Sequence, residues 1–227
     1  MKTIVHNTAG KILTDLQPVA GIVEKRHTMP ILGNLLLKGQ GKKLQVTGSD
    51  LEIQIQSTVT TAADCEKVET TVNSHKLITL LKTLPVDQET TLQLTEGKLL
   101  VKSGRSRFTL QTLPAADYPL FQLDADFGAS VSVPQGVLRQ LLKRVTFAVA
   151  PDDDVRYFLL GVLVVIEAGH LRLVATNGSR LALAEATVES LNDFKRQEVI
   201  LPRKMAMQLQ TMLRDTDEPV ELRLAAK

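Results

Sequence analysis

The residue types that could support catalysis or metal binding are scattered along this chain of 227 residues. Its four histidines, at positions 6, 27, 75 and 170, lack the spacing of metal ligands or of a catalytic pair. Three aspartates at 152–154 lack further oxygen ligands at suitable spacing, so a solvated loop is the better interpretation. Phosphate-binding glycine loops and the GxSxG nucleophile motif are absent from the sequence. We therefore expect no catalytic residue, no metal site and no cofactor.

Basic side chains recur in or beside segments with helical periodicity, where they could hold phosphate groups. Lysine and arginine bind phosphates through charge and do not read the bases, so such binding is independent of sequence. A basic helix face is also commonly only solvated, and the residues alone favour that reading. The net charge of +2 neither requires nor excludes a polyanionic partner. The residues are Lys11, Lys76, Lys82, Arg139, Lys143, Arg144, Arg203, Lys204 and Arg214.

The composition is that of an ordinary soluble protein, with 44% hydrophobic and 23% charged residues. Cys65 is the single cysteine, which rules out an intramolecular disulfide and suits a reducing compartment. The N-terminus has no apolar signal region, and no apolar run reaches the length of a membrane span. We expect a cytoplasmic protein.

An internal repeat organises the elements that carry these residues. The segments TGSDLEIQI, 47–55, and NGSRLALA, 177–184, share a Gly-Ser pair at an offset of 130. DQETTLQL, 87–94, and DEPVELRL, 217–224, stand at the same offset, whereas residues 44 and 46 match 171 and 173 at 127. Three anchors at nearly constant offset predict two copies of one domain, with a three-residue insertion in the second.

Each copy reads as strand, helix, several strands, helix and strands. Apolar periodicity predicts helices over 12–20, 72–84, 137–145 and 201–213, with Pro18 indicating a kink or an early end in the first. Alternation at Leu51, Ile53 and Ile55 predicts a half-buried strand. The expected fold class is α+β, with domains over residues 1–125 and 126–227.

The second copy is shorter than the first at its C-terminal end. After residue 94 the first copy continues with a hairpin that turns near Ser103 and Gly104, then a loop. The matching part of the second copy would begin at the last residues of the chain, 225–227. We expect the second domain to lack its closing strands and the chain to be a truncation of a longer protein.

Five motifs, in order along the chain, resemble those of the bacterial DNA polymerase III β subunit family, the sliding clamps. They are MPILGNLLL at 29–37, SGRSRFTLQTLPAADYP at 103–119, DVRYFLLGV at 154–162, VATNGSRLALA at 174–184 and LPRK at 201–204. The resemblance implies tandem clamp domains, each with two helices packed on antiparallel sheets, the second repeat truncated and the family's third domain absent. It covers the N-terminal two-thirds of the family's length.

The resemblance also implies a function. Two subunits of the family close head to tail into a ring around duplex DNA, which a clamp loader places and which makes the replicative polymerase processive. The implied partners are double-stranded DNA, the polymerase III catalytic subunit, the clamp loader and other clients, at the bacterial nucleoid. The subunit is not an enzyme. The alternative is an adaptor that docks clients without encircling DNA. Without the third domain, the fragment is expected to be a monomer or to associate in a non-native way through exposed edges.

Family positions give three sets of candidate residues. The family often has arginine where His75 stands and histidine where Ser179 stands, so both positions depart from the pattern. The residues alone favour ordinary core for Leu159 and Leu181, and leave a half-exposed strand as likely as an interface at 105–110. The DNA set is Arg26, His75, Arg156, Tyr157 and Lys204; the client-peptide pocket is Leu159, Thr176, Gly178, Ser179, Arg180 and Leu181; the dimer interface is Lys98, Arg105, Arg107, Phe108 and Leu110.

Overall fold

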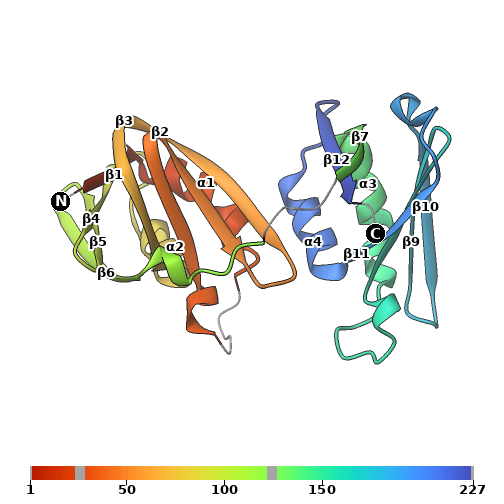
Figure 1. Ribbon diagram of the computed structural model, residues 1–227, viewed down its shortest axis with the longest axis horizontal. Helices are drawn as coiled ribbons and strands as arrows, with labels where there is room; N and C mark the ends of the chain where they lie inside the picture. Colours follow the sequence, from red (N-terminus) through yellow and green to blue (C-terminus); the bar gives the residue numbers. More distant parts are fainter. Residues whose placement is uncertain (1, 24–28, 122–126, 226–227) are drawn as a thin grey trace. The chain divides into compact units, whose positions relative to one another are not determined.

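The computed structural model describes residues 2–23, 29–121 and 127–225. They form two compact units, residues 1–121 and 122–227. The boundary expected after residue 125 falls among 122–126, outside the described residues. Each unit contains two helices and antiparallel strands, which confirms the predicted α+β class (Figure 1).

Unit 1 has one antiparallel sheet of six strands in the order β1-β4-β5-β6-β3-β2 (Figure 1). Its helices α1 and α2 pack beside each other. The elements are β1 (Lys2–Thr8), α1 (Ala9–Ala20), η1 (Pro30–Gly33), β2 (Asn34–Ser49), β3 (Gln54–Asn73), α2 (Ser74–Thr83), β4 (Glu89–Thr95), β5 (Lys98–Ser103), β6 (Ser106–Leu113) and η2 (Ala115–Asp117).

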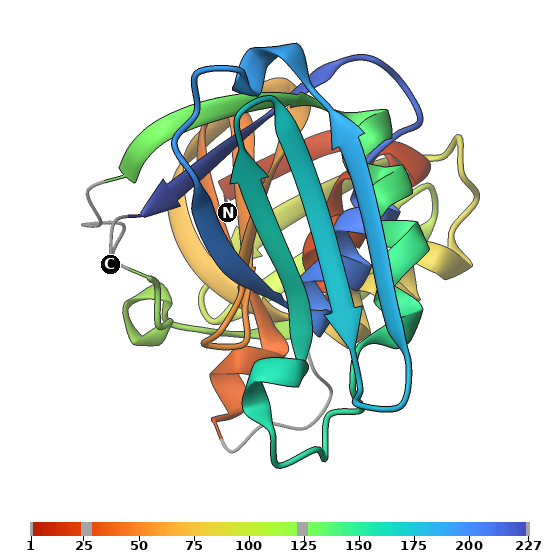
Figure 2. The same ribbon diagram turned by 90° about the vertical axis from the view of Figure 1, so that its right-hand side faces the viewer.

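Unit 2 has two separate sheets, a four-stranded one in the order β10-β9-β8-β11 and the pair β12-β7. Figure 2 shows β8, β9 and β10 side by side. The elements are β7 (Phe127–Pro134), α3 (Gln135–Val145), η3 (Thr146–Ala148), η4 (Tyr157–Leu159), β8 (Gly161–Glu167), β9 (His170–Thr176), β10 (Leu181–Thr187), η5 (Glu189–Leu191), β11 (Gln197–Pro202), α4 (Arg203–Met212) and β12 (Pro219–Ala225).

The two units pair their strands by the same scheme, as the repeat predicts. β1 pairs with β4 in unit 1, and β7 pairs with β12 in unit 2. The first half of β2 pairs with the end of β3, from Asn34 with Asn73, and the second half pairs with its start, up to Ser49 with Gln54. Unit 2 repeats these two ladders with separate strands, β8 with β11 and β9 with β10. The long strand β2 of unit 1 therefore corresponds to β8 and β9 of unit 2, and β3 corresponds to β10 and β11.

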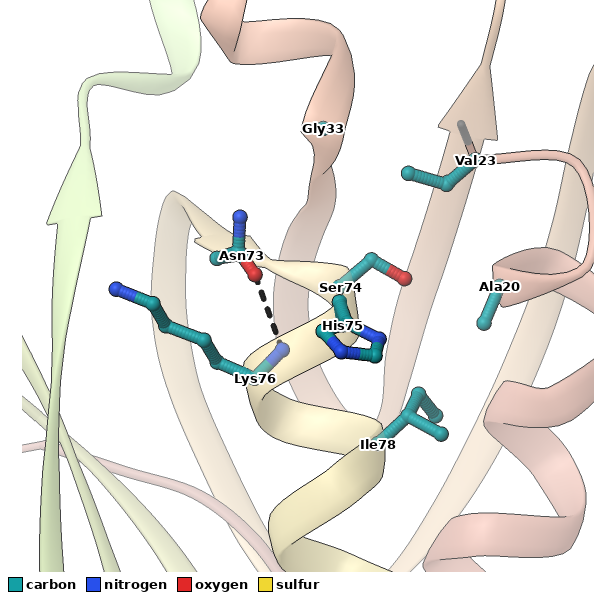
Figure 3. A pocket seen from close by; sticks show the side chains of 8 residues that line it. All are labelled: Ala20, Val23, Gly33, Asn73, Ser74, His75, Lys76 and Ile78. Atoms are coloured by element: carbon teal, nitrogen blue, oxygen red, sulfur yellow. Dashed lines mark hydrogen bonds between the residues drawn. The ribbon is translucent and has the colours of Figure 1, made fainter. Parts of the chain in front are cut away.

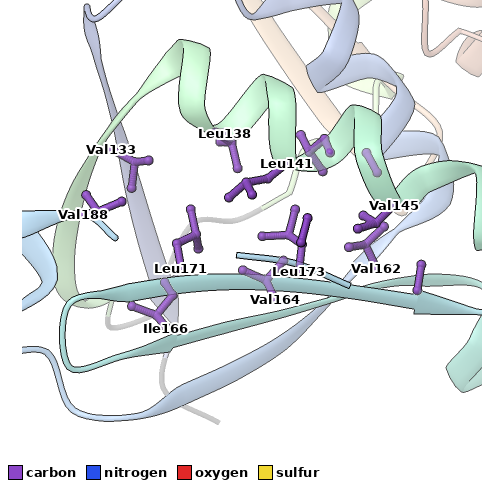
Figure 4. Close-up of a cluster of buried hydrophobic side chains, with 14 of the residues drawn as sticks. Val133, Leu138, Leu141, Val145, Val162, Val164, Ile166, Leu171, Leu173 and Val188 are labelled. Carbon is purple, nitrogen blue, oxygen red and sulfur yellow. The ribbon is translucent and has the colours of Figure 1, made fainter. Parts of the chain in front are cut away.

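The core of each unit lies between its first helix and its sheet. In α1 the buried residues include Ile12, Leu16 and Val19; the corresponding residues of α3, 126 positions later, are Leu138, Leu142 and Val145. In Figure 4, Leu138, Leu141 and Val145 of α3 face the core side chains of β8 and β9, which are Val162, Val164, Ile166, Leu171 and Leu173. Burying such a side chain contributes about 1.5–3 kcal/mol, so these stripes fix which helix face meets the sheet.

The helices begin by different means in the two units. In unit 1, Thr8 Oγ1 accepts a hydrogen bond from the Lys11 amide at 3.4 Å, and Asn73 Oδ1 accepts one from the Lys76 amide at 3.0 Å. In unit 2, Pro134 and Pro202 precede α3 and α4, without a side-chain cap. Both prolines are N-cap residues just before the first turn, with φ −57° and −53°, close to the value that the proline ring imposes.

One local prediction is wrong, and of the two outcomes predicted at Pro18, a kink or an early end, the early end does not occur. Leu51 does not belong to a strand: it sits in the turn before β3 at φ 76°, is 48% exposed, and β3 begins only at Gln54. Pro18 does not end α1 early, because the helix continues to Ala20 and the Gly21 amide still reaches the Gln17 carbonyl at 3.1 Å. In both places local geometry overrides the residue pattern.

Candidate functional site

The start of α2 lines a hollow of about 370 Å³ that holds one of the predicted DNA-binding residues, His75. Ala20 and Val23 form part of its wall after α1, and Gly33 another part before β2. In Figure 3 the His75 ring and the Ser74 hydroxyl lie toward Ala20 and Val23, whereas the Lys76 side chain extends away. An imidazole beside the free amides of a helix start suits an anion such as phosphate. Arg26 lies outside the described residues.

A second basic hollow, of about 420 Å³, lies between α3 and α4. Lys143 and Arg203 line it together with Phe147 and Met207, so it combines cations with apolar walls. Arg203 also donates to the Ala150 carbonyl at 3.2 Å, which fixes its side chain at the start of α4. Lys204 follows it on the helix and is half-buried. Two of the predicted basic residues, Lys143 of α3 and Arg203 of α4, therefore line the same hollow of unit 2.

Arg156 ties two loops of unit 2 together. Its Nη2 atom donates to Asp154 Oδ2 at 2.7 Å and to the Asn177 carbonyl at 3.1 Å. These bonds hold the pKa of Asp154 down at about 2 and raise that of Arg156. Asp154 thus neutralises the arginine that the resemblance assigns to DNA, and Tyr157 beside it stays 80% exposed. Tyr157 is therefore the more exposed of the two residues, and Arg156 is the one held by an ion pair.

The two Gly-Ser segments form turns that are stabilised differently. In unit 1 the Asp50 carboxylate accepts hydrogen bonds from the amides of Glu52 and Ile53, at 3.1 and 2.7 Å. In unit 2 this role passes to Asn177, whose Oδ1 accepts from the Ser179 and Arg180 amides at 3.1 and 3.0 Å. Both are turns in which a side-chain oxygen mimics a backbone carbonyl. Arg180 occupies the position of Asp50 in the repeat, but its side chain does not accept the turn's amide hydrogen bonds.

Apolar side chains gather in exposed positions near the Asn177 turn. The Arg180 guanidinium lies 5.7 Å from the centre of the Phe147 ring, a cation–π distance. Leu181 is 66% exposed, so it is not ordinary core. Gly178 adopts φ 90°, a left-handed conformation that favours glycine, and the end of the Arg156 side chain lies where a Cβ would point.

The remaining predicted pocket residues lie close to this turn. Thr176 is half-buried, and its hydroxyl donates to the Arg180 carbonyl at 2.8 Å. Leu159 is also half-buried, and its backbone joins Ala150 and Arg156 by hydrogen bonds. Ser179 is exposed at the tip of the turn. Arg156 brings the Leu159 segment and the Asn177 turn together.

Exposed aromatic residues are a part of this surface that the sequence reasoning did not select. Phe147 is 61% exposed and Phe158 is 55% exposed. The ring of Phe158 meets that of Tyr157 edge to face, with centroids 5.9 Å apart. Only 4% of the residues are aromatic, so the three aromatic residues at 147, 157 and 158 were the sequence feature that could have indicated this surface.

The hairpin of β5 and β6 carries the predicted interface residues. It turns at Gly104, near the expected place, and pairs Val101 with Phe108 and Leu99 with Leu110. Arg105 lies in the turn and not on the strand, which corrects the predicted alternation because the strand begins one residue later. Lys102 stands opposite Arg107, and like charges at such a position destabilise a sheet unless an acidic partner compensates them. Lys98, at the start of β5, is exposed.

Comparison with known proteins identifies the family. The family described as "DNA polymerase III beta subunit, N-terminal domain" matches residues 1–123, and the one described as the central domain of the same subunit matches residues 132–227. The chain belongs to the DNA polymerase III β subunit family. Its clamp fold is therefore shown by two independent features, the family match and the architecture.

Two curated relatives are both called "Beta sliding clamp". The Pseudomonas aeruginosa protein is 42% identical over 209 residues, which are 92% of this chain and 56% of the relative. The Escherichia coli K12 protein is 38% identical over 215 residues, which are 95% of this chain and 58% of the relative. The chain thus spans somewhat more than half the length of these relatives.

Solved structures agree with this assignment. A crystal structure of the Pseudomonas aeruginosa sliding clamp bound to griselimycin superimposes with a TM-score of 0.92 at 40% identity, covering 99% of this chain and 60% of that one. A Caulobacter crescentus polymerase III β structure gives 0.86 at 31% identity. None of the helices in the described part of the chain has the length and apolar character needed to cross a bilayer.

Proposed function

We propose that this chain supplies two clamp domains of a ring that encircles duplex DNA and keeps the replicative polymerase on its template. The observation that carries the proposal is the match of both domains, in order, to the β subunit family. The protein would act by tethering and not by catalysis. It would work inside the cell at the nucleoid, placed on DNA by a clamp loader.

Helix-borne basic side chains support the DNA contact. His75 lines the hollow at the start of α2, and Lys143 and Arg203 line the hollow between α3 and α4. We include Arg26, Tyr157 and Lys204 in this surface by family position. Arg156 would act chiefly by positioning the loop that presents Tyr157, since its guanidinium is already bound to Asp154. Contacts of this kind hold phosphates and carry no base sequence.

The Asn177 turn supports the client-peptide site. Leu159, Thr176, Gly178, Ser179, Arg180 and Leu181 would form its unit 2 part. An exposed leucine and aromatic rings offer apolar contact area, and the polar turn orients a peptide beside them. Polymerase and other clamp-binding proteins are the proposed occupants.

The β5–β6 hairpin supports assembly. Lys98, Arg107, Phe108 and Leu110, with Arg105 at the turn, would face an acidic and partly apolar surface of a second subunit, in a head-to-tail ring. Phe108 is 36% exposed and offers apolar contact area. An acidic surface of the second subunit would offset the repulsion between Lys102 and Arg107, which are opposite each other in the ladder.

Substitution of Lys204 tests the DNA contact. Lys204→Gln should weaken duplex binding similarly for unrelated sequences and lower the slope of log affinity against log salt by about 1. Lys195→Gln, an exposed lysine in the loop before β11, is the matched control and should leave both unchanged. Fluorescence anisotropy over a salt series measures the effect. A loss confined to certain DNA sequences would contradict sliding.

A further inference from the structure

A basic hollow of about 430 Å³ lies on unit 1, on β2 and β3. Lys43 and Gln45 line it, whereas the intervening residue Leu44 and its neighbour Val46 are buried in the core. Gly48, which continues the buried set, packs against Val19 of α1. The hollow therefore opens on the sheet face away from α1, opposite the helices proposed to meet DNA.

The backbone of β2 and β3 creates this hollow. The ladder shifts register between the pairs Gly39–Val68, Gly41–Cys65 and Lys43–Thr60, so β3 advances further than β2. Gly41 takes φ 58° at the shift, and a Cβ on Gly39 would stand only 2.3 Å from Cys65 Sγ. Such an irregularity spreads the strands and redirects side chains. The site is thus a product of the fold and not a chance gap between mobile side chains.

The lining carries more positive than negative charge. Three lysines, Lys38, Lys43 and Lys67, face one carboxylate, Glu69. Glu69 lies 3.5 Å from the Lys38 ammonium, and in the described part of the chain Lys43 and Lys67 have no ion pair. Gln45 and Thr58, which are opposite each other in the ladder, add an amide and a hydroxyl. Two unpaired ammonium groups are left for an anion.

Unit 2 has a smaller hollow at corresponding positions, and its positive charge is neutralised. It measures about 270 Å³, and its lining residues Val165, Glu167, His170 and Arg172 stand 127 positions after Lys38, Gln40, Lys43 and Gln45. There Glu185 lies 2.9 Å from the His170 ring and 2.6 Å from the Arg172 guanidinium. The repeat places a hollow at corresponding positions of both units, but among the described residues its positive charge is balanced by an ion-paired carboxylate only in unit 2.

We propose that the hollow of unit 1 binds a compact anion built of linked phosphates, with inorganic pyrophosphate as the simplest member. Closely spaced phosphate charges match three lysines that line one small hollow. An acidic peptide fits less well, because Val68 is the one apolar side chain in the lining and offers no anchoring pocket. No aromatic ring lines the hollow, so a nucleoside attached to the phosphates would not be recognised by stacking.

Titration calorimetry of the full chain with pyrophosphate, at low ionic strength, tests the proposal. We expect one saturable site, weakened about tenfold or more in the double variant Lys43→Gln, Lys67→Gln. Glu69→Gln should tighten binding several-fold, because it removes a repelling carboxylate and frees Lys38. Lys42→Gln, which neutralises an adjacent exposed lysine outside the lining, is the matched control and should change affinity by less than about twofold.

Several results would overturn the proposal. One is the lack of saturable pyrophosphate binding, and another is a loss of affinity in Lys42→Gln equal to that of the double variant. A third is NMR chemical shift changes on adding pyrophosphate at His170 and Arg172 instead of at Lys43 and Lys67. Tighter binding of a glutamate-rich hexapeptide than of pyrophosphate would assign the hollow to acidic peptides. Similar affinity for ATP and CTP supports recognition of the phosphates, and a strong preference for one base contradicts it. All the substituted residues are exposed, so circular dichroism can check that the variants are folded. The gain expected in Glu69→Gln cannot arise from unfolding.

Discussion

The two units share one plan of helices and strands but differ in how their sheets are joined. In unit 1 the β5–β6 hairpin links β4 to β3, so that all six strands form one sheet. In the described part of unit 2 the pair β12–β7 and the four-stranded sheet remain separate. The helix-to-sheet core is nearly the same in both, while the turns, surface charges and sheet connections differ. Core residues thus preserve the fold, and the proposed sites lie among the residues that differ.

The largest expected effect comes from breaking one core and leaving the other intact. Leu142 of α3 is fully buried, and Leu16 is its counterpart in α1. Leu142→Ala should destabilise unit 2 by about 2–5 kcal/mol, because it removes buried methyl groups and leaves a cavity. Urea unfolding followed by residue-resolved hydrogen exchange should place the loss in unit 2, and Leu16→Ala should place a similar loss in unit 1. A loss spread evenly over both units would show that the cores are not separate.

The second effect concerns the exposed leucines after the two Gly-Ser turns. Leu51 is 48% exposed and Leu181 is 66% exposed, but only Leu181 lies beside the Asn177 turn. Leu181→Asp should weaken a client peptide by about 2 kcal/mol or more, since it places a charge in the apolar contact. Leu51→Asp is the matched control and should leave peptide affinity unchanged. Equal losses in both variants, measured by fluorescence polarisation, would contradict the assignment of the pocket to unit 2.

The third effect compares the turns themselves. Asn177→Ala removes the acceptor of two amide hydrogen bonds and should cost unit 2 about 1 kcal/mol. Asp50→Ala removes the equivalent acceptor in unit 1 and should cost that unit about 1–2 kcal/mol. Unfolding monitored in each unit would separate the two losses. If Asn177→Ala left stability unchanged, the turn would not depend on this side chain.

The sequence predicts the repeated parts of the molecule well. Helix boundaries follow from apolar spacing, and Leu138, Leu142 and Val145 are buried as that spacing requires. Strand pairing follows the repeat because both copies carry the same pattern. Leu51 was misplaced because a positive φ and the Asp50 side chain turn the chain there, and alternation of residues does not report either.

The candidate sites are less predictable, since they depend on contacts between distant residues. The resemblance places Arg156 at DNA, but its carboxylate partner Asp154 becomes visible only when both side chains are positioned. The cation–π contact of Arg180 with Phe147 joins residues 33 positions apart. The hollow on β2 and β3 results from a register shift that the residue pattern does not predict.

The smallest expected effect is the pH response of the Asp154–Arg156 pair. The pKa of Asp154 is lowered to about 2 in the folded protein by hydrogen bonds from Arg156. Because the folded pKa lies below the unfolded value near 3.9, the stabilisation is present above pH 4 and is lost as pH falls toward 2. In Arg156→Gln the pKa of Asp154 should return to about 3.9 in an NMR titration. An unchanged low value would assign the shift to another group.

The most direct test of the central claim is the retention of the protein on DNA of different topology. The protein is purified from its source with its native partners and loaded by a clamp loader with ATP onto a nicked circular plasmid, which is then separated from free protein by gel filtration. The account predicts that the protein stays with circular DNA and is lost when a single cut makes the plasmid linear. Equal retention on circular and linear DNA, or none on either while client peptides still bind, would contradict the encircling ring and favour a docking adaptor.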